Sequence, residues 1–166
     1  MSFDIFYLPC RFDEKETQFT DRLTGEVRSC RKNQPLTAAD LESVKDFLKR
    51  VNARIPDGCG FYSVDFPDGG RAQIFSSSDM QRGCMVALRG ITADLLAFLL
   101  ELARVGNMLF RPAMEEVVNV VPYVEHLKKV PPDWENLVAC DSPGQLGIIL
   151  SQGFTAWKRY RDQVCE

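Results

Sequence analysis

The stretch FYSVDFPDGGRAQIFSSSD, residues 61–79, decides the fold class because it contains two strand patterns and the turn between them. Apolar residues recur at every second position on both sides of Asp68-Gly69-Gly70, which is the period of a β-strand. Asp-Gly and Gly-Gly pairs form turns readily, since glycine adopts positive φ without steric cost. The stretch therefore predicts an antiparallel hairpin. A third strand is expected at 84–88, so the three strands form a meander.

The same stretch contains two patterns that also occur in enzyme sites. Glycines that hold a phosphate lead into a helix, whereas these lead into a strand, and the lysine of the Walker motif is absent. Ser76-Ser77-Ser78-Asp79 lacks the G-x-S-x-G context of a nucleophile elbow. The single histidine, His126, is expected on the surface of a short helix at 123–129, without a partner group in the local sequence. We therefore expect no catalytic residue.

Working outward, sequence periodicity and capping residues predict the other elements. Thr37 and Asp40 can form a capping box for a first helix, and Thr92 can cap a second. The leucines of that second helix cover most of its circumference, so it is expected to be buried on more than one side. Ser142 is expected to cap a long last helix that includes WKRYRD, residues 157–162. Further strands are expected at 3–8, 108–110, 116–121 and 137–140, with a small hairpin in the polar segment 10–36.

This order of elements predicts an α+β fold in which a mostly antiparallel sheet of about five to six strands packs against three main helices. A chain of 166 residues fits a single domain, 1–166. At this length the core needs no metal or disulfide to be stable.

Composition excludes several function classes. A net charge of -3 disfavours nucleic acid as a partner, because nucleic-acid binding needs a basic face, although a local basic patch remains compatible with it. The opening MSFDIFYLPC lacks the basic start of a signal peptide, and no apolar run reaches the roughly 18 residues of a membrane span. We expect a cytoplasmic protein whose six scattered cysteines are free thiols, with no metal site and no cofactor.

Two pairs of residues are candidate binding residues. Asp133 and Trp134 lie in VPPDWEN, a loop made rigid by proline, where an exposed tryptophan would be a binding anchor. The alternative is that Trp134 folds back over the edge of the core, as tryptophans usually do. Asp65 and Arg71 flank the hairpin turn on its polar face, where they could line a pocket.

The opening MSFDIF, together with DSPGQLGIIL and GFTAWKRYRD, resembles a group of small bacterial proteins that begin with MSFD or MSYD. The shared features are a first strand and a capped helix, and they imply no activity. By analogy of size and fold class, the chain is also similar to immunity proteins of toxin systems.

Two hypotheses follow. The first is a non-catalytic bacterial protein, of an immunity or regulatory type, that binds another protein; its acidic charge could steer it to a basic partner. The second is a small enzyme or small-molecule-binding protein that uses the polar face around Asp65 and Arg71. A deep pocket that contains both residues would favour the second, whereas a flat apolar patch around Trp134 would favour the first.

Overall fold

The computed structural model describes residues 3–56, 60–77, 80–114, 117–134 and 136–151. Its elements, in chain order, are β1 (Phe3–Pro9), β2 (Thr17–Thr20), β3 (Val27–Cys30), α1 (Ala38–Arg50), β4 (Phe61–Asp65), β5 (Arg71–Ser76), β6 (Cys84–Arg89), α2 (Ala93–Val105), β7 (Met108–Pro112), β8 (Asn119–Val121), the 3-10 helix η1 (Val124–Lys128) and β9 (Leu137–Ala139). Residues 143–151 are also helical. The prediction for residues 157–162 lies outside the described residues.

The main sheet has seven strands in the order β4-β5-β6-β1-β7-β8-β9, and β2 and β3 form a separate two-stranded sheet. Its strand pairs are antiparallel except β8 and β9, which run parallel. The α+β class is confirmed. The sheet is larger than the five to six strands expected, because the three-residue strands β8 and β9 both join it.

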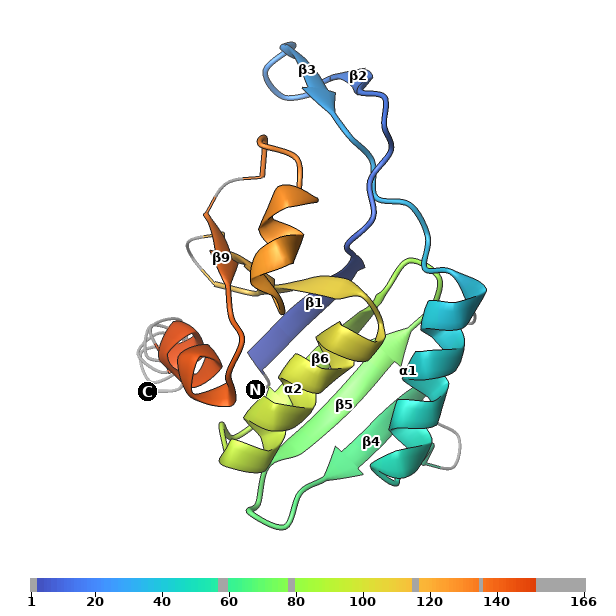
Figure 1. Cartoon of the computed structure of the whole chain (residues 1–166), viewed down its shortest axis with the longest axis vertical. Coiled ribbons are helices and arrows are strands. Elements are labelled where there is room, and N and C mark those ends of the chain that lie inside the picture. Colours follow the sequence, from blue (N-terminus) through green and yellow to red (C-terminus); the bar gives the residue numbers. More distant parts are fainter. Residues whose placement is uncertain (1–2, 57–59, 78–79, 115–116, 135, 152–166) are drawn as a thin grey trace.

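One face of the sheet, called here the first face, is covered by α1 and α2, which lie side by side over the strands (Figure 1). The larger core cluster fills this interface, with Ile5 and Leu99 fully buried. Leu146 and Leu150, from the helical residues 143–151, belong to the same cluster. Helix α2 is therefore buried on several sides, as its sequence predicts.

The opposite face, called here the second face, is covered only in part. A smaller cluster of Cys10, Leu109, Val121 and Val130 lies at its β7–β9 end, and Leu127 of η1 packs against it. None of the described helices packs on the remaining part, over β4, β5, β6 and β1. Phe6, on that part of the sheet, is exposed.

The predicted caps hold the helices in place. Thr37 and Asp40 form a reciprocal capping box on α1, and the Thr92 side chain accepts a hydrogen bond from the backbone N–H of Leu95. Ser142 Oγ accepts from the N–H of Gln145 at 3.3 Å. The side-chain oxygen of Gln145 in turn accepts from the N–H of Asp141, one residue before the cap.

The DGG sequence is a hairpin turn, as predicted. The backbone N–H of Phe66 donates to the carbonyl of Gly70 at 2.9 Å, and Gly69 has a φ of 89°. Gly70 is required for a second reason, because a Cβ at this position would clash with the Thr92 side chain. The turn therefore sets the distance between the hairpin and α2.

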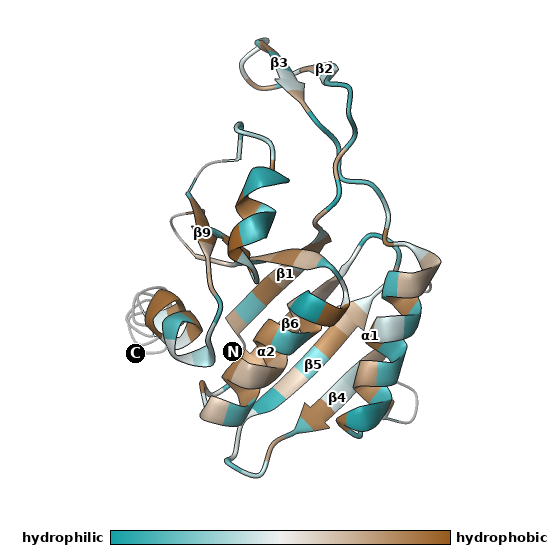
Figure 2. Cartoon of the chain, in the orientation of Figure 1, coloured by the Kyte–Doolittle hydropathy of each residue, from teal (hydrophilic) through white to brown (hydrophobic). Residues whose placement is uncertain are grey.

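The predicted small hairpin in the polar segment is present as β2 and β3, which extend away from the main sheet (Figure 1). Figure 2 shows hydrophilic residues along the segments that lead to this hairpin and hydrophobic residues along α2 and the central strands. None of the described helices is long and apolar enough to cross a membrane.

Candidate functional site

Asp65 and Arg71 face each other across β4 and β5 as directly opposed residues and form an ion pair. Both side chains are about half exposed, and they alternate with the buried Val64 and Ala72, so they lie on the second face. A pair of this kind on the surface contributes little to stability or binding, because water screens it. The structure brings these two predicted residues together without enclosing them in a pocket.

Trp134 folds back over the edge of the core, which is the alternative that the sequence left open. Its ring meets Phe12 edge-on, with centroids 5.4 Å apart, and the guanidinium of Arg111 lies 5.2 Å from the ring centroid. Asp133, next to it, is exposed. Trp134 is therefore half-buried between a phenyl ring and a cation, rather than the centre of a flat apolar patch.

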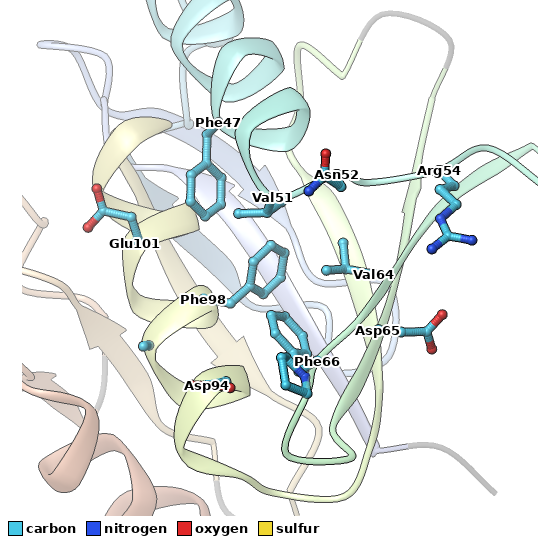
Figure 3. A pocket seen from close by; sticks show the side chains of 12 residues that line it. Phe47, Val51, Asn52, Arg54, Val64, Asp65, Phe66, Asp94, Phe98 and Glu101 are labelled. Atoms are coloured by element: carbon cyan, nitrogen blue, oxygen red, sulfur yellow. The ribbon is translucent and has the colours of Figure 1, made fainter.

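A hollow of about 590 Å³ lies between α1 and α2 at the β4 edge of the sheet. Phe98 is at its centre: the Phe47 ring stacks on it with centroids 5.4 Å apart, and the Phe66 ring lies 5.3 Å away. Figure 3 shows these three rings in a row, with Asp65 and Arg54 extending away from them. Asp65 is one of the residues that line the hollow, whereas Arg71 is not. The arrangement can hold an apolar group, but its polar residues do not converge on one point.

His126 is buried, with 7% of its surface exposed, so the prediction of a surface histidine is wrong. Its sequence neighbours are charged, yet the 3-10 helix turns the imidazole inward, edge-on to Tyr123 at 5.1 Å. Burial lowers the pKa of His126, and Lys129 adds to this effect while Glu125 opposes it. Its Nδ1 is buried and has no hydrogen-bond partner within the described chain. The histidine is therefore not joined through Nδ1 to a serine or cysteine there.

Four of the six cysteines lie in the described part, and all four are free thiols, of which Cys10, Cys84 and Cys140 are buried. Burial raises the pKa of Cys84 to about 12 and that of Cys10 to about 11, although Lys129 lowers the latter slightly. A thiol with so high a pKa is a poor nucleophile near neutral pH. Cys59 and Cys165 fall outside the described residues.

A row of apolar side chains crosses the uncovered part of the second face. The strand register places Phe61 opposite Phe75, Phe75 opposite Met85, and Met85 opposite Phe6. We call these four residues the apolar row. Phe6 is 42% exposed, and the rings of Phe61 and Phe75 lie 4.9 Å apart. Beyond Phe6, the next residue in register is Arg111 of β7.

Sequence reasoning did not identify the apolar row, although part of the signal was available. Strand alternation places Phe6 opposite the core side of β1, and Phe61 and Phe75 opposite the core sides of their strands. The length of the hairpin turn fixes Phe61 against Phe75. The pairing of β1 with β6, which joins Phe6 to Met85, links segments far apart in the chain and has no local signal.

Within the described residues, no group of three or more His, Cys, Asp or Glu side chains is arranged to hold a metal ion. No family model, curated protein or solved structure matches the chain.

Proposed function

We propose that this protein binds another protein, without catalysing a reaction, through the apolar row on the second face of its sheet. An immunity-type or regulatory role in the bacterial cytoplasm is the form of binding that the analogy of size and fold class suggests. The observation that carries the proposal is the continuity of Phe61, Phe75, Met85 and Phe6 across four neighbouring strands, in a region that no described helix covers.

The energetic argument concerns the apolar area that a partner would remove from water. A phenylalanine that is about two-fifths exposed, as Phe6 is, presents roughly 80 Å² of apolar surface. Covering that area is worth ~2 kcal/mol at about 25 cal/mol per Å². Aromatic residues and methionine are also enriched at the centres of protein interfaces. Polar groups such as the Asp65–Arg71 pair lie on the same face, as is typical of an interface rim.

The test compares two variants of equal charge. Phe6→Glu with Phe75→Glu places carboxylates in the apolar row, whereas Leu23→Glu with Val124→Glu places them at exposed positions outside it. All three proteins are used to capture partners from the native host, after their melting temperatures have been compared. We expect one protein to be captured by the wild type and the control variant and lost with the row variant.

Direct contact is then tested by replacing Met85 with a photo-reactive methionine analogue. An adduct between position 85 and the captured protein supports the proposal. It is contradicted if the captured proteins are the same for the row variant and the control, or if the adduct does not form.

A second candidate function, the binding of a small molecule, is favoured by the hollow around Phe98. Its volume of about 590 Å³ lies within the range of roughly 300–1,000 Å³ that is common for ligand sites. Ala97 lines this hollow and is exposed, so Ala97→Phe should fill it while leaving the second face unchanged. A metabolite that raises the melting temperature of the wild type, and not that of Ala97→Phe, would establish this function in place of the first.

A further inference from the structure

A basic groove of about 940 Å³ lies where the β2–β3 hairpin meets the main sheet. Its charged lining residues are Arg31 and Lys32, which follow β3, Arg82 from the loop between β5 and β6, and Arg111 of β7. In the part of the chain that the structure describes, no carboxylate lines the groove. This local excess of positive charge contrasts with the net charge of -3 for the whole chain.

The four cations have no internal counterion in the described chain, where the ion pairs involve other residues. Asp13 and Asp133 are carboxylates that lie next to groove residues, because the N–H of Asp13 donates to the carbonyl of Lys32 at 2.9 Å and Asp133 directly precedes Trp134. Asp13 Oδ1 already accepts a hydrogen bond from the side chain of Gln34 at 3.1 Å, and Asp133 is exposed beside Trp134. Like charges gathered around one hollow raise its positive potential, and an anion that enters relieves their repulsion.

Arg111 is held in place before any ligand binds. Its Nε donates to the side-chain oxygen of the buried Asn119 at 2.9 Å, and its guanidinium lies over the Trp134 ring. Within the described residues its terminal nitrogens make no ion pair, so they can bind an anion. A guanidinium fixed in this way loses less conformational freedom on binding a carboxylate than a free side chain would.

The groove also continues the proposed protein-binding surface. A smaller hollow of about 420 Å³ contains Phe6, Phe75 and Met85 of the apolar row, and it shares Leu8 and Arg82 with the basic groove. Beyond Phe6, the register of the apolar row leads to Arg111. A single partner that covers the apolar row would therefore reach the groove.

We propose that the basic groove binds an extended acidic segment of the partner protein, whose carboxylates pair with Arg31, Lys32, Arg82 and Arg111. This inference rests on the proposed function, because the groove selects the partner that the apolar row anchors. The net charge alone favours a basic partner, whereas the groove favours an acidic one. The groove decides, because charges at the contact act more strongly than distant charges that salt screens. Nucleic acid fits less well, because a long polyanion would extend past the groove onto an acidic protein.

The probe is a fluorescent hexaglutamate peptide, and its binding is followed by anisotropy at low and at physiological salt. The triple variant Arg31→Glu, Lys32→Glu, Arg82→Glu is compared with a control of equal net charge, Lys45→Glu, Lys49→Glu, Arg89→Glu, at exposed cations outside the groove. We expect the groove variant to weaken binding by roughly tenfold or more, the control to change it by less than about threefold, and salt to weaken binding to the wild type. Hexaglutamine should not bind.

Absence of hexaglutamate binding, or equal weakening by both triple variants, would overturn the inference. So would tighter binding of inorganic phosphate or of a single-stranded oligonucleotide than of the peptide. The uncharged variant with Phe6→Ser and Phe75→Ser separates the two proposals, because it changes the apolar row without adding charge near Arg111 and Arg82. If it binds hexaglutamate and captures the same proteins as the wild type, the groove is supported and the proposed function is contradicted. If it loses the captured protein while neither it nor the wild type binds hexaglutamate, only the groove is contradicted.

Discussion

The carboxylate of Asp68, in the hairpin turn between β4 and β5, accepts a 2.8 Å hydrogen bond from the backbone N–H of Asp94 in the first turn of α2. The N–H of Gly70 also donates to Asp68, at 3.3 Å. Desolvation acts to raise the pKa of Asp68, but the hydrogen bonds from Asp94, Thr92 and Gly70 outweigh it and hold that pKa below its usual value. One side chain thus joins the meander to the helix that covers it.

Replacing Asp68→Ala should lower the melting temperature, because two backbone N–H groups lose their acceptor. Since the folded-state pKa is lowered, the stabilisation is present above the usual pKa of an aspartate and is lost as the pH falls through the folded value. Thermal unfolding at pH 7 and pH 3 should therefore show a large difference between variant and wild type at pH 7 and a small one at pH 3. Asp46→Ala, which removes an exposed carboxylate from α1, is the control. A difference that does not change with pH would contradict this account.

Gly70→Ala should destabilise the protein by about 1–3 kcal/mol, the usual cost of forcing an extra methyl group into a packed site. The added Cβ would clash with the Thr92 side chain and come 3.1 Å from Leu95 Cβ. Gly60→Ala is a matched control, because a Cβ there meets nothing within 4 Å. Urea unfolding of both variants provides the measurement. Equal stability of the two would show that the turn and α2 can move apart without cost.

Local patterns predicted the fold more completely than the binding surfaces. The caps at Thr37 and Thr92, and the turn at Gly69, depend on a few adjacent residues, so their chemistry is visible in the sequence. The prediction that His126 is exposed was wrong. The charged residues around it in the sequence indicate exposure, whereas its buried position depends on the packing of η1 against the second face. The basic groove combines Arg31, Arg82 and Arg111 from three distant segments. The pairing of β1 with β6 and β7 brings the segments of Arg82 and Arg111 together, and the Phe12–Asn33 bridge and the hydrogen bond from Leu36 to Gln81 bring the segment of Arg31 to them.

Phe98→Ala should cost ~3–5 kcal/mol in the free energy of unfolding, because it leaves a cavity between two aromatic neighbours. Phe98 is 4% exposed and contacts both Phe47 and Phe66. Phe19→Ala, at a side chain that is 46% exposed on β2, should cost much less. Chemical denaturation gives both values. A loss below ~1 kcal/mol at Phe98 would mean that the region between the helices is not packed as described.

His126 should make stability depend on pH near neutrality. Burial and the nearby Lys129 lower its pKa, whereas Glu125 opposes them. The unfolded chain then binds more protons than the folded one between the folded pKa and the usual value near 6.5, so stability rises with pH across this window and is lost as the pH falls through it.

His126→Gln removes the titrating group. The free energy of unfolding of this variant should therefore change less than that of the wild type between about pH 7.5 and pH 5, the range in which a histidine usually titrates. Lys128→Gln, at an exposed neighbour in η1, should retain the wild-type pH dependence. If the His126→Gln and wild-type curves are parallel, the imidazole is equally solvated in both states.

Buried thiols should resist modification for as long as the protein stays folded. The thiolate is the reactive form, and the pKa values of Cys84 and Cys10, raised to about 12 and about 11, leave little of it near neutral pH. Burial also raises the pKa of Cys140, although the hydrogen bond with the Ser142 backbone and the nearby Arg104 oppose that rise. In contrast, Cys30 on β3 is only half-buried. A maleimide added to the native protein at pH 7.5 should therefore label Cys30 well before Cys10, Cys84 and Cys140, as read by peptide mass spectrometry. Labelling in denaturant, where all thiols are accessible, is the control. Native labelling of Cys84 at the rate of Cys30 would show that the core opens readily at the Tyr7–Cys84 end of the β1–β6 pair.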